Sequence, residues 1–387
     1  MSDLTGFPRG DARMPAGARP PRQSALRWVA GLMAALVALL LGLITLVLIG
    51  FSTGPVPFLA GLVVAVLPVP VYVMMALWVD RFEAEPAWLL AVAFFWGALV
   101  AVGIAIIVNS VGVTAVETAF GRDAADFYGL SISAPLVEEG TKALALFILF
   151  YWKRDEFDGV VDGIVYAAMV GLGFAMTENI KYYGEAVLEG RTFGTFVVRG
   201  MFSPYAHPLF TSMTGIGLGL ASHSTRRATR LVMPAVGFAL AVVLHSLWNT
   251  SLYLTGRTEN GLIALVMYFL IMVPIFTGVL LTIFYALRRE GRILREHLRC
   301  DIERGLLTPE EYERLCSVRG RMGATFGALR RRGVEGWRAR TRFHGLASEL
   351  AFQRFRVSRG VVMGGGVEEE REALYLHAMR ELRTRLW

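Results

Sequence analysis

Cysteine is scarce in this chain of 387 residues, in which only Cys300 and Cys316 occur. Their spacing fits no zinc module, and we expect both to be reduced thiols in the cytosol. No internal repeat is evident, and the triple glycine Gly364–Gly366 is followed by no phosphate-binding motif. These absences give no support to a disulfide-rich secreted protein, a zinc-finger module or a nucleotide-binding loop.

Residues 288–387 contain no lysine, but they contain 22 Arg and 14 Asp and Glu. The net charge of this segment is +8, and that of the whole chain is +7. Basic segments beside a membrane bind anionic lipid, and by the positive-inside rule they lie on the cytoplasmic side. We therefore expect anionic lipid as a partner of this tail, and no nucleic acid, because no nucleic-acid-binding motif is present. The tail also holds Thr308-Pro-Glu-Glu311, a capping box that predicts a short helix.

Charge is absent from several long stretches. The chain is 55% apolar with a mean hydropathy of +0.50, and a helix of about 20 apolar residues crosses about 30 Å of hydrocarbon. The sequence therefore predicts an all-α fold, a polytopic membrane helix bundle with a small helical cytosolic C-terminal region. We place eight spans at about 28–51, 57–79, 87–112, 130–152, 159–183, 196–222, 231–254 and 261–287.

The basic loop residues predict the orientation of these spans. Arginine and lysine gather in the N-terminal tail, the 4–5 loop, the 6–7 loop and the C-terminal tail, which places both termini in the cytoplasm. The exception is the 5–6 loop, which carries Lys181, Arg191 and Arg199. No cleavable signal peptide is expected. We predict a multi-pass protein of the cell inner (plasma) membrane, with a disordered tail at 1–26, a membrane domain at 27–287 and a basic helical tail at 288–387.

The fourth span contains three charged residues where hydrocarbon is expected, namely Glu138, Glu139 and Lys142. Each charge at a membrane helix centre costs roughly 2.5–3.5 kcal/mol on insertion scales. On a helix, Lys142 lies one turn from both carboxylates and neutralises one of them. The other needs a proton or another cation. The pair of Glu138 and Lys142 alone can also be a structural ion pair.

Four more polar residues lie in later spans: Glu178, His207, His245 and Asn249. At 1.5 Å per residue the ionisable groups fall about 7 to 16 Å below the outer membrane boundary. Two imidazoles with one or two carboxylates are a ligand set typical of Zn²⁺, which lowers the pKa of a bound water to about 7. A free glutamate then serves as general base, and Asn249 can donate to a developing oxyanion. A lone membrane histidine is more often a packed residue, so the prediction rests on the group. The remaining histidines, including His344, are expected to face solvent.

The motifs resemble those of the PrsW family of intramembrane metalloproteases, relatives of the prenyl-protein (CAAX) processing proteases. The matching residues are Glu138-Glu139-x-x-Lys142, Phe174-x-x-x-Glu178-Asn179, His207-Pro208 and His245-x-x-x-Asn249, within about 75–285. Asp80–Pro86 is similar to the family's acidic loop, and the tail looks like the cytosolic extension of actinobacterial members.

The resemblance implies a protease that cleaves membrane-anchored proteins, including anti-sigma factors, with a single-span protein as partner. It implies catalysis by Glu138 and Glu139 with Glu178, His207 and His245 around the metal or water, while Lys142 balances charge and Asn249 completes the predicted catalytic set. The expected cofactor is Zn²⁺, and a Glu–His pair activating water without metal is the alternative seen in the CAAX relatives. A proton- or ion-coupled transporter can use the same buried groups, and a non-catalytic scaffold is a third possibility.

Overall fold

The computed structural model describes residues 21–82, 85–154, 156–157, 159–203, 205–222, 224, 226–358 and 367–386, and these parts contain helices and no strand. Residues 1–20, His223 and the triple glycine lie outside the described residues. The first helix begins at Pro21, inside the segment that we expected to be disordered.

The membrane-type helices occur at all eight predicted positions. In chain order their bounds are α1 Pro21–Thr53, α2 Pro55–Val66, α3 Val69–Val79, α4 Ala87–Phe95, η1 Trp96–Ala101, α5 Val102–Phe120, α6 Arg122–Tyr128, η2 Gly129–Ser133, α7 Ala134–Trp152, α8 Val160–Leu188, α9 Thr192–Phe196, η3 Val197–Phe202, α10 Ala206–Ser222, α11 Arg227–Thr258, α12 Gly261–Met267, η4 Tyr268–Met272 and α13 Val273–Leu298. The η elements are π-helical turns. Six stretches in the described chain are long and apolar enough to cross a membrane.

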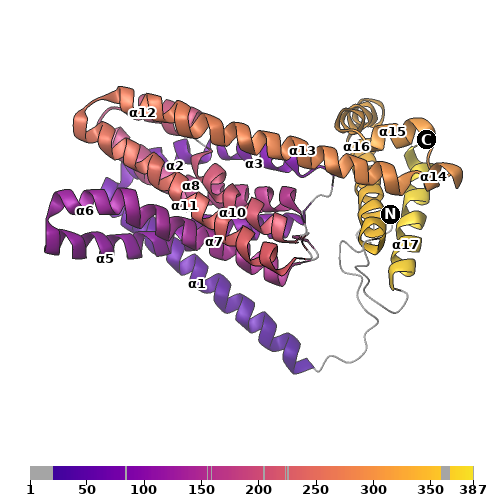
Figure 1. Ribbon diagram of the computed structural model, residues 1–387, viewed down its shortest axis with the longest axis horizontal. Coiled ribbons are helices and arrows are strands. Elements are labelled where there is room, and N and C mark those ends of the chain that lie inside the picture. The colour runs from indigo at the N-terminus through magenta and orange to yellow at the C-terminus, as the bar shows by residue number, and fades with distance from the viewer. Residues whose placement is uncertain are drawn as a thin grey trace.

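The two predicted spans outside those six are α7 and α10. Helix α7 carries Glu138, Glu139 and Lys142, which make it less apolar, and α10 has only 17 residues. Both helices lie inside the bundle, against the other spans (Figure 1). The fold is therefore an all-α polytopic membrane bundle, as predicted.

Helix α8 is the central element of the bundle. Its apolar stretch is 83% buried, compared with 44% or less for the other five stretches. Close approach depends on glycine, because a Cβ on Gly163 would lie 2.1 Å from the Gly215 carbonyl oxygen of α10, and one on Gly171 would lie 2.6 Å from the Pro208 nitrogen. These glycines bring the His207 segment of α10 against α8.

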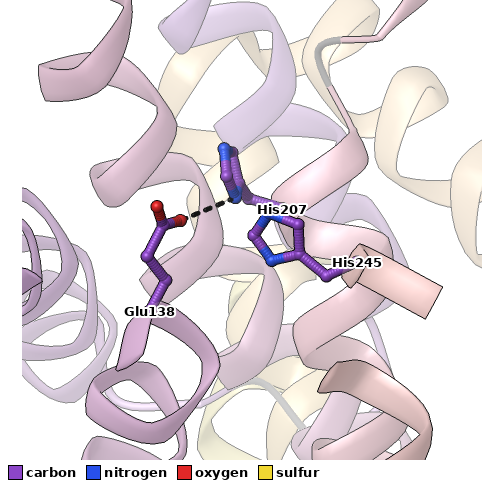
Figure 2. Close-up of side chains that lie close together, drawn as sticks. All are labelled: Glu138, His207 and His245. Carbon is purple, nitrogen blue, oxygen red and sulfur yellow. Dashed lines mark ion pairs between the residues drawn. The ribbon is translucent and has the colours of Figure 1, made fainter. Parts of the chain in front are cut away.

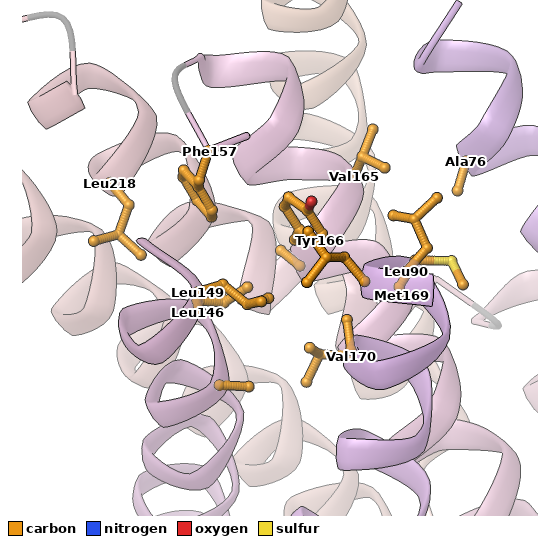
Figure 3. Packing of buried hydrophobic residues seen from close by; sticks show 14 of the residues in the cluster. Ala76, Leu90, Leu146, Leu149, Phe157, Val165, Tyr166, Met169, Val170 and Leu218 are labelled. Carbon is orange, nitrogen blue, oxygen red and sulfur yellow. The ribbon is translucent and has the colours of Figure 1, made fainter. Parts of the chain in front are cut away.

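An apolar cluster closes the end of the bundle nearest the C-terminal helices. Tyr166, Val170 and Leu146 are fully buried there, and side chains from α3, α4, α7, α8 and α10 meet around them (Figure 3). This packing holds α7 and α8 in register, which sets the relative height of their polar residues.

Helix α13 continues out of the bundle into a helical C-terminal domain (Figure 1). The domain adds α14 Cys300–Glu303, α15 Pro309–Leu315, α16 Val318–Ser358 and α17 Val367–Leu386. The predicted capping box is present, with Thr308 and Glu311 bonding each other's backbone N–H groups. The loop between α3 and α4 inserts Phe82 into the core of this domain, so the domain is packed onto the membrane bundle.

The prediction for His344 is wrong. Its side chain is buried on α16, with Arg321 and Arg340 nearby, instead of facing solvent. Burial and these two guanidinium groups hold the pKa of His344 well below its usual range. Charge-rich helices such as α16 usually face water, and the packing of α16 against α13, α15 and α17 buries part of its surface.

Candidate active site

The charged residues of α7 share one face of the helix, as their spacing predicts. The Lys142 Nζ lies 3.0 Å from Glu139 Oε1 and 3.4 Å from Glu138 Oε2. Glu139 and Lys142 have no exposed surface. The ammonium group also lies 3.8 Å above the Phe174 ring of α8. One lysine therefore serves two carboxylates, and an apolar ring closes the side of the group that faces α8.

The two predicted membrane histidines meet these groups from α10 and α11. His207 Nδ1 is 2.9 Å from Lys142 Nζ and 3.8 Å from Glu138 Oε2, and its Nε2 is 3.1 Å from Glu178 Oε2. The rings of His207 and His245 stand edge to face with centroids 5.3 Å apart. Figure 2 shows Glu138 and both imidazoles pointing toward one another. The predicted convergence of four helices on one polar centre is thus present.

Glu138 and Glu139 have different surroundings. Glu139 accepts hydrogen bonds from Thr211 Oγ1 at 2.8 Å and from Lys142, and it lies 3.1 Å from His245 Nδ1. Among the described residues, Glu138 has polar contacts only with Lys142 and His207, at 3.4 Å or more. Glu139 therefore has three close polar partners and no exposed surface, whereas Glu138 keeps acceptor capacity.

A cavity of about 100 Å³ lies beside Glu138, and water molecules fit in a space of this size. Glu139 is not among its lining residues. The polar side chains that line it are Glu138, Glu178, Asn179, Tyr182, Arg199, Ser203, His207, His245 and Asn249. The cavity thus brings both histidines and two carboxylates into contact with a common space.

Glu138, His207 and His245 each offer a ligand atom, and these atoms lie within 4.8 Å of one another. One carboxylate and two imidazoles are a donor set that Zn²⁺ uses. With both histidines neutral, the three glutamates of the site exceed Lys142 and Arg199 by one negative charge, which favours a cation. The group contains both predicted histidine ligands, but it has Glu138 where the sequence prediction has Glu178.

Glu178 is engaged by a residue that the sequence reasoning did not assign to the site. Arg199, in the π-helical turn η3, donates to Glu178 Oε2 at 2.5 Å and to Asn179 Oδ1 at 2.7 Å. Its guanidinium lies over the Tyr182 ring at 3.6 Å. Arg199 belongs to the loop that departs from the charge pattern of the others, but Lys181 and Arg191 of the same loop pair with exposed glutamates. The charge pattern therefore marks the loop, and only the structure shows that Arg199 is the residue that reaches Glu178.

Asn249 lines the cavity one turn after His245, as predicted. Its amide donates to the Leu130 carbonyl at 3.1 Å, in the π-helical turn η2. A π-helical turn leaves carbonyls available for such side chains. Asn249 therefore ties α11 to the start of α7, and its second N–H keeps the predicted oxyanion role open.

Comparison with known proteins gives one consistent result. A family model described as the PrsW family intramembrane metalloprotease matches residues 85–279. Protease PrsW of Geobacillus kaustophilus is 32% identical over 170 residues, 44% of this chain and 69% of that protein. Protease PrsW of Oceanobacillus iheyensis is 32% identical over 166 residues, with coverages of 43% and 70%. Protease PrsW of Bacillus subtilis is 30% identical over 170 residues, with coverages of 44% and 72%. No solved structure matches.

Proposed function

This chain belongs to the PrsW family of intramembrane metalloproteases and is a peptidase, and we propose that it cleaves membrane-anchored proteins within the bilayer through Glu138 and the two histidines. The observation that carries this proposal is the convergence of Glu138, His207 and His245 beside a polar cavity. Hydrolysis at membrane depth requires water at the scissile bond, and this cavity is where such water can reside.

In this mechanism Glu138 is the general base. Its carboxylate has the fewest close partners of the three glutamates and borders the cavity, so it can accept a proton from a water molecule there. Lys142 places a positive charge 3.4 Å from Glu138, and the Glu178–Arg199 pair lines the same cavity. A positioned base of this kind contributes about 10²–10⁴-fold in rate.

Glu139 is a positioning residue in this proposal. It holds His245 Nδ1, which fixes the tautomer of the ring and leaves Nε2 with its lone pair available. Thr211 and Lys142 in turn hold Glu139. The sequence prediction gave Glu138 and Glu139 equal catalytic standing, and the geometry supports a division between a base and an orienting group.

The donor set fits the metal that the family description implies. His207 and His245 would hold it beside the free carboxylate of Glu138, and Zn²⁺ would supply Lewis acidity and a more acidic bound water. Glu178, the other predicted ligand, lies 3.1 Å from His207 Nε2 and would orient that ring. Metal analysis of the purified protein before and after chelation, combined with a cleavage assay, distinguishes a zinc-dependent reaction from the metal-free Glu–His alternative.

The test of the function is cleavage of a single-span substrate in vesicles. Glu138→Gln should reduce the cleavage rate by about 10²-fold or more, whereas Glu117→Gln, an exposed residue of α5, should leave it unchanged. Equal rates for wild type and Glu138→Gln would contradict the assignment. Radiolabelled ion or proton flux that depends on Glu138, without cleavage, would favour a transporter instead. No observation on the described residues supports a transporter.

The substrate class and the topology are part of the same proposal. We infer a single-span membrane-anchored protein as substrate, with anti-sigma factors as the class that the family resemblance suggests. Both termini are proposed to be cytoplasmic, with anionic lipid beside the arginine-rich C-terminal domain and the protein in the cell inner membrane. Accessibility of single cysteines placed at Arg22 and Arg380 to a membrane-impermeant thiol reagent tests the orientation.

A further inference from the structure

A second, larger cavity lies away from the candidate active site, where the membrane bundle meets the C-terminal domain. Its volume is about 670 Å³. Its walls come from the α3–α4 loop, the start of α8, the end of α10 and the C-terminal half of α13. Helix α13 changes from apolar to basic at this level, since Tyr285 and Ala286 are followed by Arg288 and Arg289. The cavity is thus at the height of a lipid headgroup.

One side of the cavity is acidic. Asp80 is 4% exposed, and its Oδ1 has no hydrogen-bond partner among the described residues, while its Oδ2 accepts from the Glu85 N–H at 2.7 Å. Asp162, in the first turn of α8, also lines the cavity. Burial, with Asp162 nearby, raises the pKa of Asp80 to about 8. A buried carboxylate oxygen without a partner favours a ligand that donates hydrogen bonds and carries positive charge.

The other side of the cavity, formed by α13, carries two arginines and one glutamate, Glu290. Arg289 and Arg292 of α13 line it, and neither has an ion pair with a carboxylate in the described part of the chain. The Arg289 guanidinium lies 6.0 Å from the centroid of the Phe355 ring. Two guanidinium groups without acidic partners favour phosphate oxygens.

The two sides together restrict the ligand. A divalent cation beside Asp80 would be repelled by the arginines, and a purely anionic headgroup on the arginines would lie near Asp162 and Glu290 and would leave Asp80 Oδ1 without a hydrogen-bond donor. A ligand with both charges satisfies both sides. The remaining wall is apolar and open toward lipid, since Leu220 is 45% and Tyr285 65% exposed. Acyl chains can therefore leave along α10 and α13.

We propose that this cavity binds a phosphate group joined to a primary amine, as in the headgroup of phosphatidylethanolamine. Arg289 and Arg292 hold the phosphate, and Asp80 Oδ1 accepts from the ammonium. A bound lipid at this position would contact the α3–α4 loop, α8 and α13 at once, and it would link the membrane bundle to the C-terminal domain.

The experiment is native mass spectrometry of the full chain, delipidated in detergent and mixed with defined lipids. Wild type should bind phosphatidylethanolamine about tenfold more tightly than phosphatidylcholine, whose quaternary nitrogen has no N–H, and than phosphatidylglycerol, which has no amine. Asp80→Asn should abolish the preference over phosphatidylcholine and raise relative binding of phosphatidylglycerol. Arg289→Gln should weaken binding of all three lipids.

Arg288→Gln is the matched control, because Arg288 is an exposed neighbour that stacks on Phe284 instead of lining the cavity. It should bind like wild type. Soluble phosphoethanolamine is a separate arm: binding as tight as that of the lipid would identify a free compound with the same chemistry. Equal binding of the three lipids, or an undiminished preference in Asp80→Asn with its cleavage activity and helical content intact, would overturn the proposal.

Discussion

Two buried charge networks, one in the membrane bundle and one in the C-terminal domain, are built from the same residue types and differ in completeness. In the C-terminal domain Arg354 donates to both oxygens of the buried Asp301, at 2.5 and 3.1 Å, to Glu372 at 2.8 Å and to the His297 carbonyl at 2.7 Å. In the membrane bundle Lys142 is shared between two carboxylates and a histidine, and Glu138 borders a cavity.

The difference shows that the burial of charged side chains does not by itself identify a catalytic site. A network in which every donor and acceptor has a close partner is structural, because a reacting molecule has no group to bind. A network beside a cavity can keep an acceptor atom that no protein donor satisfies. An unsatisfied buried acceptor is unfavourable, so it indicates that a ligand or water binds there. The following predictions test that distinction, from the largest effect to the smallest.

Removal of a histidine from the membrane network should have the largest effect. His207→Ala and His245→Ala should each abolish stoichiometric metal binding and reduce cleavage by about 10³-fold, since each removes an imidazole from the group of three. Elemental analysis and the vesicle assay measure the two effects. Full activity in both variants would show that the membrane network is as structural as that of the C-terminal domain.

Removal of Arg354 should instead cost stability. Arg354→Met leaves the buried Asp301 with only the more distant Arg304, at 3.9 Å among the described residues, which should lower the free energy of unfolding of the C-terminal domain by about 3–5 kcal/mol. Urea denaturation of the full chain in detergent measures this change, and cleavage below the transition should stay at the wild-type rate. Arg257→Met is the control, because its pair with Asp123 is exposed and its loss should leave the free energy of unfolding nearly unchanged. A lower cleavage rate in Arg354→Met without unfolding would show that the network of the C-terminal domain is not purely structural.

Within the membrane network, Glu139 should behave differently from Glu138. Glu139→Gln and Thr211→Val disturb the support of His245 but leave the cavity lining intact, so metal affinity should fall about 10–100-fold and excess metal should restore part of the cleavage. Glu138→Gln should not be rescued in this way. Metal titration followed by the cleavage assay separates the two, and identical behaviour would remove the division of roles.

The smallest predicted effect concerns pH and the C-terminal domain. His344 is buried with a pKa well below its ordinary 6.5, so in acid the unfolded chain binds a proton that the folded domain excludes. Stability is therefore present above about pH 6.5 and falls as pH is lowered, by at most about 1.4 kcal/mol per pH unit. Denaturation of the full chain at pH 7.5 and 5.5 should show this slope. His344→Gln should flatten it and the exposed His377→Gln should not.

Much of the membrane fold followed from local patterns. The apolar runs predicted eight spans, and helices occupy all eight positions. The spacing of Glu138, Glu139 and Lys142 put them on one face, and depth along each span put the histidines at the same level. The burial of His344 and the contact of Arg199 with Glu178 were missed, because each depends on the partner helix that happens to lie opposite.

The sequence by itself determined which helices form, which are apolar enough for a membrane, and which residues bring charge into it, since these depend on composition and on a period of 3.6 residues. The tertiary structure decided which of the adjacent glutamates faces the cavity, that Glu138 joins the two histidines while Glu178 pairs with Arg199, and that two arginines and Asp80 share a second cavity. These choices depend on helix rotation and crossing, set by glycine contacts such as Gly163 with Gly215, and distances between separate helices are not encoded in any local pattern.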